Sequence, residues 1–554
     1  MPHELFRKGF SLLLKSQTNI LSAAFIIMVT IILSQILGLI KQRLLVSIFG
    51  ASDTLGIYLA STRLPDFLFQ LIIAGALASA FIPIFSDYLS KNKVQEAHKM
   101  ASSLLAIGVS IFAVLSAILF VWAPFFLTIF NLGSGFSNEE MNLMANLTRI
   151  IIFGQLLFII GTFFSALLQS YNHFFIPGIA AALYNLGIIT GIITLSSTVG
   201  IFSPAYGVLL GALFFIIVQL PMVKKIGFSF KPTFSFRVPG VLAVLHLMWP
   251  RTVAMAIFQM GTIAIVAIIS FLPNPGRNYV IFDYAQTLAF APIVLFGQSI
   301  AQAAFPILSR EKNNLENFKT TFVASFNQIL YLILPVSVLL LVLRIPIVRL
   351  IFGAGQFDWE ATVLTGKTLA FFSISLFAQA LIYLVSRGFY ALHDTKTPLY
   401  IGATTTAVMI ALGFLFIFSS GLGIESMAAA YSIATIINLV ILFIFLDRKV
   451  GGFKKTSLIF PILKIFSATF FTGFALYIPI KLLDQLVFDT TRTINLIMLT
   501  GISAFAGLSL YLFLTWLFNV KEATTFLLIF KKIGNWREVL KKSDEVIDAT
   551  TVKP

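Results

Sequence analysis

Apolar runs of 20 or more residues alternate with short polar loops along almost the whole chain. About 20 apolar residues are enough to cross a bilayer as a helix, and the pattern predicts about 14 such spans. We expect them near residues 20–46, 56–89, 98–130, 142–170, 176–197, 203–222, 241–272, 278–309, 317–350, 361–391, 397–418, 425–446, 457–482 and 493–518. The sequence therefore predicts an all-α polytopic membrane protein.

The second run, Ile57–Ser90, is too long for a single plain crossing. Three helix-breaking residues interrupt it: Pro65, Gly75 and Pro83. Its first half contains Arg63 and Asp66, which are three residues apart and can therefore pair on one helix face. Because charge at membrane depth is costly, it normally faces a protein-lined or watery interior. We interpret this broken helix as a wall of an internal cavity. The alternative is a self-neutralised pair that only sets helix packing.

Composition supports the membrane assignment, because 58% of the residues are hydrophobic and only 11% are charged. Soluble domains carry about 25% charged residues. The formal net charge is +16, but the cations gather in alternate short loops, so the charge follows the positive-inside pattern and does not indicate a nucleic-acid partner. These loops contain Lys91, Lys93 and Lys99, then Lys224, Lys225, Lys231 and Arg237, then Arg310, Lys312 and Lys319, and then Arg448, Lys449, Lys454 and Lys455. We expect both termini in the cytoplasm, as an even number of spans requires.

A repeat divides the first twelve spans into two halves. The segment Ala80–Ser86 recurs as Ala304–Ser309, with the prolines 223 positions apart (83 and 306). The segment Ser165–Pro177 recurs as Ser386–Pro398, at an offset of 221 (165 and 386). Six spans separate equivalent positions, so the two repeats share one orientation and are parallel, related by an axis along the membrane normal. Spans 13 and 14 fall outside this repeat.

No enzyme site stands out. The chain has five His without an HxxxH or HExxH pair, lacks a GxxxxGK[ST] loop, and contains no cysteine for thiolate metal sites or disulfides. We therefore expect a transporter that is not an enzyme and that uses no cofactor or metal. Its energy would come from the membrane potential or from an ion gradient, with the ion left open.

The candidate binding residues are polar side chains at membrane depth. In the first half these are Lys41, Gln42, Arg43, Arg63, Asp66, Gln70, Arg149, Gln155 and Gln169; in the second half they are Arg251, Gln259, Asp283, Gln286, Gln298, Gln302, Gln379 and Arg387. Several cations against few acids favour an anionic ligand, and the planar fork of Arg suits phosphate. Lys41, Arg43 and Arg251 lie near span ends, so snorkelling to the headgroups is their alternative role. Arg63 is the deepest candidate.

Several short motifs, in order and with few gaps over spans 1 to 12, carry a family resemblance. In the first half they are Ser34-Gln35-Ile36-Leu37-Gly38, Phe49-Gly50-Ala51, Arg63-Leu64-Pro65, and Gly75-Ala76 leading into Ala80-Phe81-Ile82-Pro83. In the second half they are Met248-Trp249-Pro250-Arg251 with Gln259, Phe305-Pro306-Ile307-Leu308-Ser309, Phe352-Gly353 with Gly355, and Gly388-Phe389-Tyr390-Ala391 followed by Asp394 and Lys396-Thr397-Pro398. In these motifs the chain resembles the MurJ (MviN) lipid II flippases.

The resemblance implies the multidrug/oligosaccharidyl-lipid/polysaccharide (MOP, MATE-like) transporter fold. In that fold two parallel six-helix lobes surround a cationic central cavity, and two extra helices form a groove for the lipid tail. The chain departs from the family at several cavity positions, where charged residues of the family fall on Gln35, Lys41-Gln42, Phe69, Ala74, Gln286, Thr287 and Phe290, and an ion-coordinating Asn of some members falls on Gly413. Among these, Lys41 keeps the charge sign. The substrate-binding set we expect here is Lys41, Arg43, Arg63, Asp66, Arg251, Gln286 and Gln298.

The resulting division of the chain is an N-terminal lobe at 1–222, a C-terminal lobe at 223–450, the extra helix pair at 451–520 and a basic cytoplasmic tail at 521–554. For the tail, a helix on the inner leaflet and a solvated segment are both open. We expect a monomeric lipid II flippase of the bacterial cytoplasmic membrane. It would bind a polyprenyl-diphosphate-linked glycan and the phospholipid bilayer, but no nucleic acid. The alternatives are a flippase for another polyprenyl-linked glycan, of O-antigen or capsule type, and a non-transporting membrane scaffold of the same fold.

Overall fold

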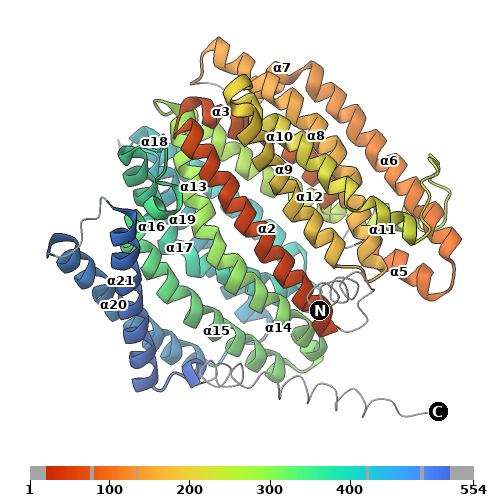
Figure 1. Cartoon of the computed structure of the whole chain (residues 1–554). Helices are drawn as coiled ribbons and strands as arrows, with labels where there is room; N and C mark the ends of the chain where they lie inside the picture. The colour runs from red at the N-terminus through yellow and green to blue at the C-terminus, as the bar shows by residue number, and fades with distance from the viewer. Residues whose placement is uncertain are drawn as a thin grey trace, which may run out of the picture. The chain divides into compact units, whose positions relative to one another are not determined.

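The computed structural model describes residues 20–74, 80–130, 132, 135–419, 423–486 and 492–524, which form helices joined by short turns, with no strand among them (Figure 1). Twelve helical segments in this part of the chain are long and apolar enough to cross a membrane. The two remaining predicted spans correspond to α12 (Val241–Ile269) and to the interrupted segment 56–89. The predicted all-α polytopic fold is confirmed. The basic tail beyond residue 524 lies outside the described residues.

The second predicted span is a series of short pieces. After α2 (Ile20–Phe49) come α3 (Asp53–Ser61), α4 (Arg63–Phe69), the π-helix η1 (Gln70–Ala74) and α5 (Ile82–Ser90). Pro65 and Pro83 each lie in the first turn of a helix, α4 and α5 respectively, where the missing N–H of proline would have no intrahelical partner. Gly75 lies outside the described residues. The predicted interruption of this span is therefore real, and Arg63 begins one of its short helices.

The rest of the first repeat consists of α6 (Val94–Val121), α7 (Ala123–Ile129), α8 (Asn138–Ser170), α9 (Phe175–Val199), α10 (Phe202–Ile217) and α11 (Leu220–Lys225). Helices α9 and α10 touch along a stripe of glycines. A Cβ on Gly187 would lie 2.4 Å from the backbone of Gly211, and one on Gly191 would lie 2.4 Å from that of Gly207. Each helix thus carries a GxxxG pattern, which lets membrane helices approach closely enough for backbone contact.

The second repeat begins with α12 and continues through α13 (Pro275–Pro292), the π-helix η3 (Ile293–Gln298), α14 (Ser299–Arg310), the 3₁₀-helix η4 (Glu311–Asn313), α15 (Leu315–Val342), α16 (Arg344–Phe352), α17 (Trp359–Ala391), α18 (Lys396–Ser419) and α19 (Glu425–Lys449). The chain then adds α20 (Lys455–Leu486) and α21 (Thr493–Leu517).

The helix boundaries reproduce the predicted repeat. Helices α6 and α15 have 28 residues each and begin 221 positions apart (94 and 315), and α8 and α17 have 33 residues each and begin 221 positions apart (138 and 359). The turns that follow α8 and α17 contain Asn172 and His393, which share a positive φ near 60°. The two π-helices, η1 and η3, begin 223 positions apart (70 and 293). The predicted pair of six-span repeats is therefore confirmed down to its irregular turns.

Two compact units make up the structure, and each is described by itself. Unit 1 contains the residues up to Asp283 with Ile351–Leu364 and Thr406–Ala430, and unit 2 contains Tyr284–Leu350, Thr365–Thr405 and the residues from Tyr431 onward. These units do not follow the repeat, because α12 packs against α4 and η1 and therefore joins the first unit. The division at residues 222 and 450, which was drawn from the repeat, stays a prediction.

In unit 2 the extra helices pack on α15. The Tyr511 hydroxyl donates to the carbonyl of Tyr331 at 2.7 Å, and α20 contacts both α15 and α21. The turn between α17 and α18 is held by Asp394, which accepts from the hydroxyl of Thr397 at 2.8 Å and from the ammonium of Lys449. Burial opposes ionisation of Asp394, but these donors outweigh it and lower its pKa to about 2. This carboxylate therefore connects α18 and α19 through its hydrogen bond with Thr397 and its ion pair with Lys449.

Candidate functional site

Unit 1 contains a cluster of charged side chains within segments that are predicted to cross the membrane, contributed by three helices. Lys41 comes from α2, Arg63 and Asp66 come from α4, and Asp283 comes from α13. Two cations therefore face two carboxylates. Charged groups in such a position normally mark a ligand or ion pathway.

Arg63 forms its ion pair with Asp283. Its Nη2 atom lies 2.6 Å from Asp283 Oδ1, and its Nε donates to the hydroxyl of Tyr279. Tyr279 and Asp283 are four residues apart on α13 and therefore lie on one face, where together they hold the guanidinium from two sides. The side chains of Arg63 and Asp283 are 22% and 16% exposed. A half-buried fork of this kind suits recognition of phosphate oxygens.

The expected pairing of Arg63 with Asp66 is replaced by this contact. Asp66 Oδ1 accepts instead from Nε2 of Gln155 on α8, at 2.7 Å. The long side chain of Arg63 reaches α13, while the short carboxylate of Asp66 lies beside α8, against which α4 packs. Asp66 therefore does not restrain the guanidinium, and Asp283 does.

Lys41 completes the cluster. Its ammonium donates to Asn185 Oδ1 on α9 at 3.2 Å, and Asn185 in turn donates to the carbonyl of Ser34 on α2 at 3.2 Å. The charge of Lys41 interacts with the carboxylates of both Asp66 and Asp283. The hydrogen-bond partner of this cation is thus a neutral amide, while both carboxylates of the cluster interact with its charge.

The other predicted residues lie elsewhere or are not described. The guanidinium of Arg43 donates to the carbonyl of Ile351 at 3.2 Å on an exposed part of unit 1. Arg251 belongs to α12, but its side chain lies outside the described part of the chain. Gln286 on α13 and Gln298 at the end of η3 are half-buried and belong to unit 2. Their proposed roles in substrate binding stay predictions.

Four residues of the cluster were not in the predicted binding set: Gln155, Asn185, Tyr279 and Asp283. Gln155 and Asp283 were recognisable as polar residues at membrane depth, but the sequence offered no way to connect Asp283 with Arg63, 220 positions earlier (283 and 63). Asn185 and Tyr279 gave no distinct signal, because a single amide or phenol in an apolar span is compatible with ordinary packing.

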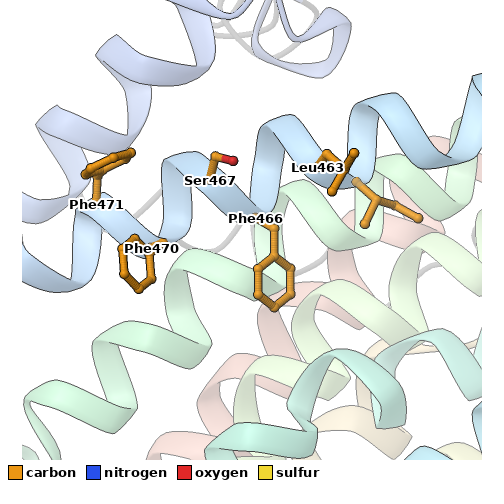
Figure 2. Close-up of a pocket in the computed structure, with 6 residues that line it drawn as sticks. Leu463, Phe466, Ser467, Phe470 and Phe471 are labelled. Carbon is orange, nitrogen blue, oxygen red and sulfur yellow. The ribbon is translucent and has the colours of Figure 1, made fainter.

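Unit 2 carries an apolar concavity of about 570 Å³ along α20. Its lining residues are Ile462, Leu463, Phe466, Ser467, Phe470 and Phe471. Figure 2 shows Phe466 and Phe470 projecting from the same side of α20, as their spacing of four residues requires, while Phe471 projects from the opposite side. Phe466 and Phe470 are 54% and 61% exposed. Such a surface can take hydrocarbon chains but has almost nothing to offer a charged group.

Comparisons with known proteins agree with this architecture. Residues 45–496 match the model of the family described as lipid II flippase MurJ. A protein of Buchnera aphidicola subsp. Schizaphis graminum, named probable lipid II flippase MurJ, is 28% identical over 505 residues that cover 87% of this chain and 95% of that protein. A solved structure of lipid II flippase MurJ in an inward closed conformation is 25% identical, with a TM-score of 0.72, and covers 89% of this chain and 98% of that one.

A more distant solved structure supports the fold alone. It is an inward-facing multidrug resistance MATE family transporter of the MOP superfamily, 12% identical with a TM-score of 0.63, and it covers 76% of this chain and 94% of that one. The MOP-like fold and the parallel repeats agree with the predicted resemblance. The family match extends over most of the chain, including the helices that carry Arg63, Asp66 and Asp283. The chain is thus a multi-pass membrane protein that belongs to the lipid II flippase MurJ family.

Proposed function

We propose that this protein moves lipid II, the undecaprenyl-diphosphate-linked peptidoglycan precursor, across the bacterial cytoplasmic membrane. The observation that carries this proposal is the buried cluster with Lys41 and Arg63, within a chain that belongs to the lipid II flippase family. The two cations would bind the diphosphate. The apolar surface of α20 would hold part of the polyprenyl tail, because it exposes large aromatic side chains and no charge.

In this proposal Asp283 controls the availability of Arg63. While the site is empty, the carboxylate and the Tyr279 hydroxyl fix the guanidinium fork. An arriving diphosphate competes with Asp283 for the same donors, so that binding exchanges one anion for another at the guanidinium. The exchange also allows release, since Asp283 can recover the guanidinium when the lipid leaves.

The direct experiment is complementation. The gene is expressed in a bacterium whose own lipid II flippase can be depleted, and growth and lipid II on the outer leaflet are followed. We expect growth to be restored together with outer-leaflet lipid II. A protein that reaches the membrane in normal amount but leaves lipid II on the inner leaflet would contradict the proposal.

The proposed orientation places both termini in the cytoplasm, and topology reporters test it. Tags at Lys93, Lys225 and Lys454 are expected to report the cytoplasmic side, because these loops carry the excess of cations. Tags at Ser137 and at Ser420, which lies outside the described residues, are expected to report the external side. One loop with the opposite result would overturn the predicted span count and the parallel repeat together.

The proposed tail site on α20 predicts a loss that depends on tail length. Replacing Phe466 and Phe470 together by Ser is expected to weaken binding of full-length lipid II while leaving a short-tailed analogue unaffected, because the apolar surface of α20 would bind hydrocarbon and offers nothing to the diphosphate. The matched control replaces Phe505 and Phe513 of α21, which are 76% and 53% exposed, by Ser. Equal losses for the two double variants, or for the two lipids, would show that α20 acts only through packing in the bilayer.

We further propose that the protein works as a monomer, that it needs no cofactor or nucleic acid, and that the membrane potential or an ion gradient supplies the energy. The family relationship makes it a transporter. Native mass spectrometry from mild detergent and transport into vesicles with imposed potentials test the first and last of these points.

A further inference from the structure

Asp66 and Gln155 form one half of a recognisable two-point contact. A protonated carboxyl group and a primary amide can join through two hydrogen bonds in a ring: the amide N–H donates to one carboxyl oxygen, and the carboxyl O–H donates to the amide oxygen. The first bond is present, because Gln155 Nε2 donates to Asp66 Oδ1 at 2.7 Å. The second bond lacks a proton.

The amide oxygen of Gln155 is a second, independent observation that points to a proton on Asp66. Gln155 is only 7% exposed, and among the described residues its Oε1 is buried and has no hydrogen-bond partner. An amide oxygen in such a place needs a donor. The amide is fixed in direction by its N–H contact with Asp66, so the same carboxyl group, through Oδ2, is the natural donor once it is protonated.

We propose that Asp66 and Gln155 form a proton-binding pair that loads one proton from the aqueous phase. In this step hydronium gives its proton to Asp66 Oδ2 and leaves as water, and the new O–H donates to Gln155 Oε1. No other bond changes. The pair lies on α4 and α8, beside the cations that would bind the substrate.

The surroundings of Asp66 determine what this proton does. The ionisable groups facing it are Lys41 on α2, Tyr58 on α3, Arg63 on α4, Tyr184 on α9, and Tyr279 and Asp283 on α13. Helix α8 contributes the neutral Gln155. The remaining neighbours of α4, which are α6 and α12, carry their described ionisable residues near their first turns: Glu96, His98, Lys99 and His246.

Loading the proton would change the balance of the cluster. With Lys41 and Arg63 charged and both carboxylates ionised, the charges cancel; with Asp66 protonated, one positive charge is left. Since opposite charges attract, the loaded cluster would bind a diphosphate more tightly, and bound diphosphate would by linkage favour the loaded form. This consequence rests on the proposed lipid II transport, whereas the proton-binding pair itself does not.

The first experiment detects the proton directly. Infrared difference spectra of the full-length protein are recorded between acidic and alkaline pH, where a protonated carboxyl group shows its own C=O stretching band. We expect such a band in the wild-type protein and its absence in Asp66→Asn, whose amide can still form both bonds with Gln155 and so keeps the fold. Asp87→Asn, which removes a carboxyl group that is 55% exposed, is the matched control and should keep the band.

The partner is tested by Gln155→Met, which keeps the length of the side chain and removes the amide. We expect the Asp66 band to move to higher frequency, because the carboxyl C=O loses the hydrogen bond from Nε2. Identical difference spectra for the wild type and Asp66→Asn would overturn the proton site. A band that stays unshifted in Gln155→Met would overturn the pair.

The second experiment tests the link with substrate. Binding of farnesyl diphosphate, a short soluble probe, is measured at acidic and alkaline pH in detergent. We expect the affinity of the wild type for this probe to be at least about five-fold higher at acidic pH than at alkaline pH. In Asp66→Asn the charge of residue 66 does not change with pH, so any pH effect in this variant is subtracted. The same pH dependence in both proteins would overturn the link. If the infrared band is present but the wild type moves no lipid II, the proposed function fails and the proton-binding pair stands.

Discussion

Replacing Arg63 by Ala is expected to reduce lipid II transport per folded molecule by about ten-fold or more. Charge-assisted hydrogen bonds contribute about 1.5–3 kcal/mol each, and a loss of about 1.4 kcal/mol corresponds to a factor of ten in affinity. The guanidinium of Arg63 already offers two donors within the cluster, to Asp283 and to Tyr279, and the same donors would face the diphosphate. Transport is measured in vesicles and normalised to correctly folded protein.

The single substitution also leaves Asp283 as a half-buried carboxylate without its cation, which destabilises the fold. The double variant Arg63→Ala with Asp283→Asn separates the two effects. We expect it to recover expression and thermal stability but not transport. Arg63→Lys should recover part of the transport, because it keeps the charge and loses the planar fork. Arg149→Ala is the control, because this exposed arginine donates to the carbonyl of Phe120 away from the cluster. Full normalised transport in the double variant would mean that Arg63 only packs the helices.

Replacing Gly56 by Ala is expected to separate α3 from the start of α13. A Cβ on Gly56 would lie 2.1 Å from the carbonyl oxygen of Gly276 and 2.2 Å from its Cα, and a backbone cannot give way as a flexible side chain does. The neighbouring N–H of Arg277 donates to Asp53 at 3.0 Å and would lose this contact when the helices part. Overpacking of this kind costs about 1–3 kcal/mol.

The absence of cysteine makes this separation measurable. Leu55 on α3 is completely buried, so a single cysteine at that position should react slowly with a membrane-impermeant thiol reagent in the parent protein and quickly in the Gly56→Ala background. Gly38→Ala and Gly108→Ala serve as controls, since nothing lies within 4 Å of a Cβ at either position. If thiol reactivity and melting temperature are unchanged in Gly56→Ala, then α3 and α13 can move apart without loss. Their contact would then contribute little to the stability of the fold.

The spans and the repeat could be predicted from the sequence because both are periodic. Apolar length defines a membrane helix, and prolines at a constant offset reveal a duplicated layout, as Pro83 and Pro306 do. The break in the second span followed from its prolines. The count of twelve long apolar helices differs from the prediction only where a helix is divided or only partly described, at residues 56–89 and in α12.

The site was less predictable because its contacts are not local. Arg63 could be selected as the deepest cation, with Lys41 as a candidate near a span end, but sequence distance favoured Asp66 as the partner of Arg63. The structure gives that role to Asp283. Which carboxylate pairs with the Arg63 guanidinium depends on how α4 and α13 pack. The sequence pattern within either helix does not predict that packing. Arg43 lies near a span end, and its guanidinium donates to the carbonyl of Ile351 away from the cluster, so its role in binding or in snorkelling stays a prediction.

The π-helix η3 determines the rotational phase of the helix that follows it. A π-turn accommodates one residue more than an α-turn, and each residue of an α-helix turns the chain by about 100°. Helix α14 buries a stripe made of Ala301, Ala304 and Leu308. Removing one residue from η3 would rotate that stripe by about a quarter of a turn and bring other side chains of α14 into the core of unit 2. The π-helix η1 lies at the equivalent place of the first repeat, so both halves of the chain insert the same extra residue before the helix that follows.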